Sequence, residues 1–222
     1  MNSKQKFNGT LIVIVGPTAS GKTNTAIELA KYYNTQVISC DSRQFYKEIP
    51  LGTAAPTQNE LDEVKHHFIG NLSVIDDYNA SKFENDVMCL LNNELVNSEF
   101  VVMSGGSGLY IDAVCKGIDL LPDIDNAIRE STKKLFEDNG ISALQKKLSI
   151  LDPDYFVEVD HNNPVRMMRA IEVCEQTGER YSYLRKNQTK KREFDIVKIG
   201  IDVPREILVK RINNRTDSMI ES

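Results

Sequence analysis

The sequence of 222 residues lacks a surplus of positive charge: 27 lysines and arginines stand against 32 aspartates and glutamates, a net charge of −5. Proteins that bind nucleic acid over their whole surface are usually basic, so any such contact must come from a local patch. Long apolar runs are also lacking. Residues 1–8 are polar, and the apolar run after them is about five residues long, whereas a signal sequence needs roughly 7–15 and a membrane span about 20. We therefore expect a cytoplasmic protein that makes no membrane contact.

Cysteine pairs are missing as well. The four cysteines (Cys40, Cys89, Cys115 and Cys174) are scattered, without a C-x-x-C pair, which predicts reduced thiols rather than a disulfide framework or a zinc site. The adjacent histidines His66 and His67 have no third ligand near them in sequence, so we expect a structural or substrate-edge role for them rather than a metal site.

The most specific feature present is a phosphate-binding loop. Residues 16–23 read Gly-Pro-Thr-Ala-Ser-Gly-Lys-Thr, the G-x-x-x-x-G-K-[ST] pattern. The loop follows an apolar, strand-like run, residues 10–15, and precedes a helix-like run, residues 22–33. Such a loop wraps backbone N–H groups around phosphate oxygens at a helix N-terminus. The sequence thus predicts a site for a diphosphate or polyphosphate, with Lys22 as a point charge and the Thr23 hydroxyl placed to ligate Mg²⁺.

Strand-like and helix-like segments alternate through most of the chain. The expected strands are residues 10–15, 36–39, 100–104 and 194–203; the expected helices between them are 22–33 and 81–96. This alternation predicts an α/β protein with a P-loop NTPase-like parallel sheet and helices on both faces.

The pattern changes after residue 121, and up to about residue 192 it is helical only. The clearest helix is 164–177, with Asn163 as its cap, Pro164 at its first position and Gly178 as its stop; residues 126–138 and 142–148 are further candidates. We therefore expect an inserted all-α subdomain, residues 122–193, between two parts of the α/β core, residues 1–121 and 194–222.

Three predicted strands end in polar or glycine-rich sequence, and in a parallel sheet these ends share one ligand-binding edge. The first ends in the phosphate loop, the second in residues 40–44 and the third in residues 105–110. Asp41 is either a general base or metal ligand, or a turn residue. Residues 105–108 are either a tight turn or a place of close backbone approach to a substrate, with Ser107 as a donor.

The third predicted strand lacks an acidic end. A motor ATPase would normally carry an apolar strand ending in Asp or Asp-Glu for Mg²⁺ and water activation, whereas the third strand here ends in Ser-Gly-Gly, residues 104–106. This favours a transferase over a motor.

Two groups of cations are candidates for RNA contact. Arg166 and Arg169 share one helix face, where they either meet solvent or clamp phosphates and bases. Residues 180–192 hold six cations interleaved with Tyr181 and Tyr183, a composition that is typical of a solvated loop and also suits RNA.

Together these blocks resemble the tRNA dimethylallyltransferase (tRNA isopentenyltransferase) family. The resemblance rests on the phosphate loop, on Asp41-Ser-Arg-Gln44 with Tyr46, on Gly52-Thr-Ala54 with Pro56, on His66-His67, on Gly105 to Tyr110, and on Asn163-Pro164 with Arg166 and Arg169 to Glu172. The blocks stand in the family's order from residue 12 to about 217, and as a set they are highly specific.

The resemblance implies transfer of a dimethylallyl group from dimethylallyl diphosphate to the exocyclic N6 amine of an adenosine. That adenosine lies 3′ of the anticodon in tRNAs that read codons beginning with U. The resemblance also implies that the helical insertion grips the anticodon stem-loop. Mg²⁺ is the implied cofactor, and we expect a monomer.

The family's site residues carry over by position. Gly16, Pro17, Thr18, Ala19, Ser20, Gly21, Lys22 and Thr23 hold the donor. Asp41, Lys22, Thr23 and Arg215 are the implied catalytic residues, with Asp41 as the base and Thr23 as the metal ligand. The implied tRNA contacts are Asp41, Ser42, Arg43, Gln44, Ser107, Arg129, Val165, Arg166, Met167, Met168 and Arg169.

The chain departs from the family pattern at three points. Ser107 stands where threonine is common, so the hydroxyl is kept, and Val165 stands where glutamine is common, so one polar group for the RNA is missing. Family members usually continue past the position of Ser222, which leads us to expect a piece of a longer protein. Arg211 and Arg215 both match arginines near this end, and either is a candidate for the leaving diphosphate.

The residues leave three other functions open. They are a P-loop kinase acting on a small molecule, an isopentenyltransferase acting on free adenine nucleotides, and an RNA-binding module without catalysis. The long helical insertion argues against the kinase and against the enzyme for free adenine nucleotides, because a small substrate needs no domain that binds an anticodon stem-loop.

Overall fold

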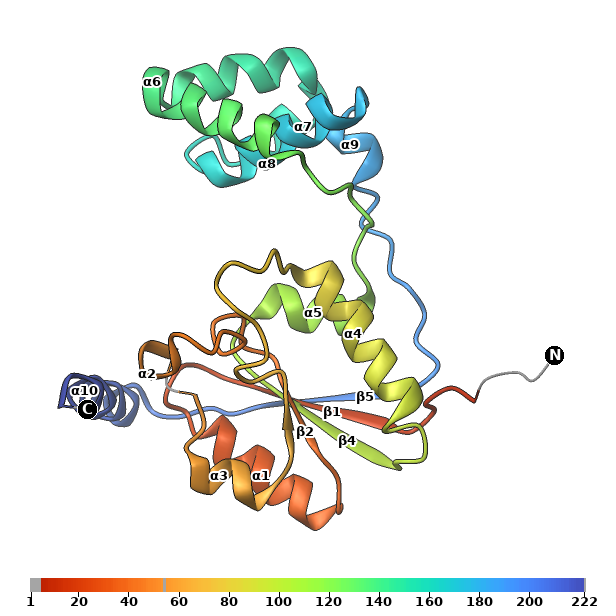
Figure 1. Ribbon diagram of the computed structural model, residues 1–222, viewed down its shortest axis with the longest axis vertical. Coiled ribbons are helices and arrows are strands. Elements are labelled where there is room, and N and C mark those ends of the chain that lie inside the picture. The colour runs from red at the N-terminus through yellow and green to blue at the C-terminus, as the bar shows by residue number, and fades with distance from the viewer. Residues whose placement is uncertain (1–4, 54, 222) are drawn as a thin grey trace. The chain divides into compact units, whose positions relative to one another are not determined.

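A computed structural model of the chain describes residues 5–53 and 55–221, and Figure 1 shows its elements. The chain divides into two compact units. The core unit comprises Met1–Ile118 and Thr189–Ser222, and the helical unit comprises Asp119–Gln188. Two chain segments, one at each end of the helical unit, connect the units, so the helical unit is an insertion into the core.

The core unit is built on a five-stranded parallel sheet in the order β3-β2-β4-β1-β5. The strands are β1 (Thr10–Val15), β2 (Val37–Ser39), β3 (His66–His67), β4 (Phe100–Ser104) and β5 (Asp195–Gly200). In the register of β1, Leu11 lies between Val101 of β4 and Ile196 of β5. The strand that carries the phosphate loop thus has a neighbour on each side, and this fixes the position of the loop.

Side chains of β1 and β4 alternate between two hydrophobic cores. Leu11, Val13, Val101 and Met103 pack on one face, and Ile14 and Val102 on the other. Helices α4 (Ala80–Asn93) and α5 (Gly108–Lys116) cover the first face, and α1 (Lys22–Tyr32) covers the second. The predicted P-loop NTPase-like α/β class, with helices on both faces, is confirmed.

The remaining core helices lie around the sheet edge that carries the site. They are α2 (Pro50–Thr53), α3 (Gln58–Glu63) and α10 (Arg205–Glu221). Helix α10 follows β5, and its Arg211 and Arg215 line the same cavity as the phosphate loop.

The helical unit has its own hydrophobic core. Its helices are α6 (Asn126–Leu151), α7 (Pro153–Glu158), α8 (Pro164–Thr177) and α9 (Tyr181–Leu184). Helix α6 is interrupted at Gly140, whose φ of 69° breaks the helix, so the two short helices expected here run on across a kink. Helix α8 has the predicted bounds: Asn163 Oδ1 accepts a hydrogen bond from the Arg166 N–H at 3.1 Å, and Gly178 ends the helix in the left-handed region.

The described helical unit ends at Gln188, whereas the sequence led us to expect the insertion to run to residue 193. Lys190 and Arg192 instead contact Glu84 of α4 in the core unit. The cations of residues 180–192 are thus largely engaged within the protein, since Arg180 also pairs with Asp154 and Arg185 with Glu158.

The described part of the chain contains no helix that is both long and apolar enough to span a bilayer.

Candidate active site

A cavity of about 510 Å³ opens at the carboxyl edge of the sheet in the core unit. It is lined by the phosphate loop and by the ends of β2 and β4, the three segments that the sequence assigned to one edge. The polar and charged side chains that line this cavity include those of Ser20, Lys22, Thr23, Asp41, Gln44, His66 and Arg215.

The phosphate loop turns sharply between β1 and α1. Gly21 (φ 97°) and Ala19 (φ 62°) both adopt left-handed backbone conformations, and at Gly21 the absence of a Cβ makes this inexpensive. Lys22 Nζ donates to the carbonyl oxygens of Gly16 at 2.9 Å and of Pro17 at 2.7 Å. The ammonium group is therefore held over the loop, where a bound phosphate would meet it.

Burial lowers the pKa of Lys22 below its ordinary value. The Asp41 carboxylate acts in the opposite direction, and the Arg215 guanidinium adds to the lowering. Three charged side chains from α1, the end of β2 and α10 therefore act on one another across this cavity. A diphosphate entering between Lys22 and Arg215 would relieve the repulsion between the two cations.

One hydroxyl in the loop is buried without a partner. Ser20 is 4% exposed, and its Oγ has no hydrogen-bond partner among the described residues. A Cβ at Gly16 would come within 2.8 Å of this oxygen and 3.1 Å of the Ile201 carbonyl oxygen, so a larger residue there would require the Ser20 hydroxyl to move. A buried hydroxyl that lacks a partner in a cavity wall fits a site that receives polar oxygen atoms.

Asp41 both shapes its turn and lines the cavity. Its Oδ1 accepts a hydrogen bond from the Arg43 N–H at 3.1 Å, and its backbone carbonyl accepts one from the Gln44 N–H at 3.0 Å. The other carboxylate oxygen, Oδ2, lies 3.9 Å from the position that a Cβ of Gly106 would take. The turn thus occupies one carboxylate oxygen and leaves the other beside the Gly105-Gly106 backbone.

The glycines after β4 allow two chain segments to touch. A Cβ at Gly105 would overlap the carbonyl group of Cys40. Ser107 Oγ accepts a hydrogen bond from the Ser42 N–H at 2.9 Å and donates to Ser42 Oγ at 3.1 Å. Ser107 therefore fastens the turn that carries Asp41, and neither serine is among the cavity-lining residues.

Gln44 and Arg215 meet at one carbonyl group. Gln44 Nε2 donates to the Thr53 carbonyl oxygen at 3.4 Å, and Arg215 Nη2 donates to it at 3.3 Å. Ser39 Oγ also donates to Gln44 Oε1 at 3.1 Å. The contact with α2 anchors Arg215 in the cavity wall, whereas Arg211, which also lines the cavity, is exposed.

Glu60 and Ile69 are among the lining residues that the sequence did not identify. Glu60 belongs to a capping box with Thr57 at the start of α3, a pattern that signals a helix start rather than a site.

The two adjacent histidines have different surroundings. His66 Nδ1 lies 2.8 Å from the Val64 carbonyl oxygen, so this nitrogen is the donor, and Nε2 is buried without a partner among the described residues. His67 instead contacts Gln36 Oε1 at 2.6 Å, a structural role.

The helical unit carries the remaining predicted site residues, and they differ in accessibility. Val165 and Arg166 are exposed at the start of α8, whereas the Met167 side chain is fully buried in the core of the unit. Arg169 Nη2 donates to the Pro122 carbonyl oxygen at 3.3 Å. Burial raises the pKa of Glu172, and the nearby Arg169 and Arg129 act in the opposite direction, so both arginines lie close to this carboxyl group.

A metal site built by the protein alone is not evident in the described residues, where no three His, Cys, Asp or Glu side chains gather in a metal-binding group. The cavity nonetheless offers the hard oxygen donors that Mg²⁺ prefers, the Thr23 hydroxyl and the Asp41 carboxylate. A magnesium ion that also binds substrate phosphate oxygens fits such a sparse set of protein ligands.

The parallel sheet, the phosphate loop and the cavity define a P-loop protein with a binding site for a phosphorylated small molecule.

Comparison with known proteins identifies the family within this class. A sequence profile described as IPP transferase matches residues 44–222. A tRNA dimethylallyltransferase 2 from Azobacteroides pseudotrichonymphae is 47% identical over 96% of this chain and 69% of its own length. A tRNA dimethylallyltransferase 1 from Bacteroides thetaiotaomicron is 44% identical with the same coverage.

Solved structures agree with these relatives. The full-length tRNA isopentenylpyrophosphate transferase from Bacillus halodurans matches with a TM-score of 0.60 and 34% identity, over 96% of this chain and 67% of its own. A eukaryotic dimethylallyltransferase acting on tRNA matches with a TM-score of 0.75 and 25% identity, over 96% of this chain and 53% of its own. The chain belongs to the IPP transferase family, and the kinase alternative is not favoured.

Proposed function

We propose that this protein transfers a dimethylallyl group from dimethylallyl diphosphate to the N6 amine of the adenosine 3′ of the anticodon, in tRNAs that read codons beginning with U. One observation carries the proposal: in a member of the IPP transferase family, the phosphate loop, Asp41 and Arg215 line a single cavity. That cavity combines a diphosphate site with a carboxylate able to accept a proton.

The phosphate loop and two cations serve the donor. Breaking the allylic C–O bond places positive charge on carbon and negative charge on the departing diphosphate. Loop N–H groups from residues 16–23, the Lys22 ammonium and the Arg215 guanidinium stabilise that negative charge as it develops. Of the two α10 arginines that line the cavity, Arg211 and Arg215, the better candidate is Arg215, because it acts electrostatically on Lys22 and is anchored by the Thr53 carbonyl group.

We further propose that the site works with Mg²⁺. The Thr23 hydroxyl would hold the ion together with the donor's own phosphate oxygens. When bound, Mg²⁺ supplies positive charge against the diphosphate. The buried Ser20 hydroxyl, which has no partner among the described residues, supports the binding of the diphosphate itself, because a diphosphate oxygen would be its polar partner.

Asp41 serves the acceptor. The adenine amine is a weak nucleophile and must lose a proton as the C–N bond forms, and the Asp41 carboxylate accepts that proton. The turn with Arg43 and Gln44 holds the carboxylate in place. The target base must leave the anticodon stack to reach it, a cost of a few kcal/mol that stacking and hydrogen bonds recover.

We propose that the helical unit holds the anticodon stem-loop. The exposed Arg166 and Val165, with Arg129, Met168 and Arg169, are its proposed contacts, and the buried Met167 side chain is left out of this surface. In the core unit, Ser42, Arg43, Gln44 and Ser107 are proposed to contact the tRNA around the target base. We expect the protein to act as a monomer in the cytoplasm.

The test is transfer of a labelled dimethylallyl group to unmodified tRNA, in the presence of Mg²⁺ and of EDTA. We expect Mg²⁺-dependent label at the adenosine 3′ of the anticodon and no label on free adenosine monophosphate. Label on the mononucleotide alone would replace the proposal with an adenylate isopentenyltransferase. Binding of tRNA without label from either acceptor would indicate an RNA-binding module.

A further inference from the structure

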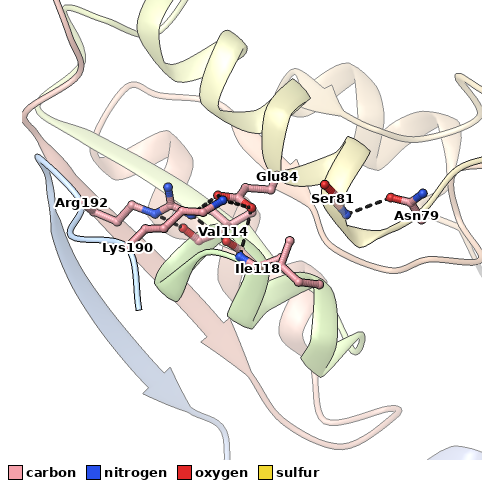
Figure 2. Close-up of polar contacts among 8 residues, drawn as sticks. Asn79, Ser81, Glu84, Val114, Ile118, Lys190 and Arg192 are labelled. Carbon is pink, nitrogen blue, oxygen red and sulfur yellow. Dashed lines mark hydrogen bonds and ion pairs between the residues drawn. The ribbon is translucent and has the colours of Figure 1, made fainter. Parts of the chain in front are cut away.

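A buried carboxylate lies in the core unit, away from the residues that line the cavity. Glu84 is on α4 with its side chain 4% exposed, and it shares the buried stripe of that helix with Val87 and Leu91. An unpaired charge at such a position is very costly, so its partners determine its role. Figure 2 shows that they come from two distant parts of the chain.

The first set of partners lies on the segment that leaves the helical unit. Lys190 Nζ contacts both carboxylate oxygens, at 3.1 and 3.2 Å, and Arg192 Nη2 contacts Oε1 at 2.8 Å. The guanidinium of Arg192, 9% exposed, also donates to the carbonyl oxygens of Val114 at 2.8 Å and Ala113 at 2.7 Å, at the end of α5. A cation at the C-terminus of a helix interacts favourably with the helix dipole.

The second partner lies on the segment that enters the helical unit. The Ile118 N–H donates to Glu84 Oε2 at 3.1 Å, one residue before the helical unit begins at Asp119. The two segments also bind each other, because the Lys190 N–H donates to the Lys116 carbonyl oxygen at 2.7 Å. A Cβ at Gly117 would run into the Lys190 side chain, so the packing here is tight.

We propose that Glu84 is a positioning residue for tRNA. Its carboxylate binds both segments that connect the two units. We call Glu84 and its partners Ile118, Lys190 and Arg192 the Glu84 cluster. Relative motion is the default for two units joined by linkers. The cluster shortens the free part of both linkers and so raises the fraction of molecules whose helical unit can engage tRNA while the target base is in the cavity.

The inference rests on the proposed function, since it assumes that tRNA contacts both units. It makes a distinct kinetic prediction. If loosening the linkers lowers the competent fraction to about a tenth, the apparent KM for tRNA rises about ten-fold, because apparent affinity falls with that fraction. The KM for dimethylallyl diphosphate and kcat at saturating tRNA stay unchanged, because the donor site lies wholly in the core unit.

The experiment compares two pairs of variants. Glu84→Gln and Lys190→Met remove a charge from the cluster with little loss of side-chain volume. Glu94→Gln and Lys65→Met make the same changes in the exposed Lys65–Glu94 pair, 3.0 Å apart at the end of the same helix. We expect the KM for tRNA to rise only in Glu84→Gln and Lys190→Met. In Lys190→Arg, which keeps the positive charge, this KM should stay near the wild-type value. An unchanged tRNA KM in both cluster variants, or an equal change in both KM values, would overturn the proposal.

Spin-label distances test the cluster without activity. Labels at Glu28→Cys of α1 and Ser142→Cys of α6, both exposed positions, are introduced with Cys89→Ser. Glu84→Gln and Lys190→Met should broaden the distance distribution and Glu94→Gln should not; equal distributions overturn the proposal. If Glu84→Gln fails to fold, Lys190→Met decides alone, since that side chain is 41% exposed. A wild type that transfers nothing refutes the proposed function, and the distances still decide the role of the cluster.

Discussion

The two oxygens of the Asp41 carboxylate have different neighbours, and this reconciles the two roles that the sequence left open. Oδ1 holds the turn through the Arg43 N–H, while Oδ2 lies beside the glycine backbone after β4. A substitution that keeps the turn but removes the base therefore separates structure from chemistry.

Asp41→Asn is that substitution, since an amide oxygen can still accept the Arg43 N–H. We expect kcat to fall by about 10²–10⁴-fold, the usual effect of losing a general base, with tRNA affinity within about two-fold of wild type. Single-turnover transfer and tRNA binding measure the two quantities. A parallel loss of tRNA binding would contradict the assignment of Asp41 as the base.

The lowered pKa of Lys22 predicts the alkaline limb of the pH profile. Burial, with Arg215, disfavours the ammonium form, so Lys22 loses its proton at a lower pH than an ordinary lysine. We expect kcat/KM for dimethylallyl diphosphate to fall as pH rises through that pKa. In Lys22→Arg, which stays protonated, the limb should move to higher pH; a limb at the same pH in both proteins would assign it to another group.

The same shift predicts a stability effect with a definite sign. The folded-state pKa of Lys22 lies below its unfolded value, so the unfolded chain binds more protons in the window between them. The contribution of Lys22 to stability therefore rises with pH across that window and is smallest below the folded-state pKa. Bound diphosphate should narrow the window, because its charge raises the folded-state pKa again.

At the scale of elements, the contact between the segments that follow β2 and β4 depends on one glycine. A methyl group at Gly105 would overlap the carbonyl of Cys40, and both groups are backbone-anchored. Gly108, at the start of α5, has open space at the same position. The two glycines therefore form a matched pair for one substitution.

We expect Gly105→Ala to lower the free energy of unfolding by about 3 kcal/mol or more, because neither backbone segment can yield cheaply. Gly108→Ala should change it by less than about 1 kcal/mol, since a helical alanine is favoured over glycine. Urea unfolding measures both. Equal stabilities would show that the turn after β2 has room to shift.

The sequence predicted the elements whose signals are local and regular. The apolar run of β1, the apolar stripe of α4 from Phe83 to Leu91 and the caps of α8 are all visible in short windows, and all are confirmed. Strand β3 was missed, because two residues pairing with β2 carry no pattern. Helix α6 was expected in two pieces, because Gly140 interrupts its pattern.

The contacts of the cation-rich stretch could not be predicted, because they depend on residues far away in sequence. Lys190 and Arg192 meet a carboxylate more than 100 positions earlier, and within their own segment they look like a solvated or RNA-binding run. The sequence around Glu84 did carry a signal that this carboxylate has buried partners. Glu84 occupies a position three residues before Val87 on the buried stripe of α4, where a carboxylate requires buried partners.

For the whole molecule, a net charge of −5 means that the attraction to tRNA must come from a local group of cations. Removing one cation that binds a phosphate should reduce the slope of log K against log salt by about 0.7–0.9. We expect that smaller slope in Arg166→Gln, because this arginine is exposed on the proposed tRNA surface. In Lys190→Gln the affinity should fall with an unchanged slope, because this charge is already paired with Glu84; filter binding from low to high salt distinguishes the two.

The hydrogen bond between the Lys190 N–H and the Lys116 carbonyl oxygen places the exit of the helical unit beside its entry. A short turn could join these two points and leave every strand of the sheet in register. The helical unit thus enters and leaves the core unit at a single point on the core's surface. A lineage could exchange that unit for one of another shape, and so acquire a different substrate, without redesigning the catalytic sheet.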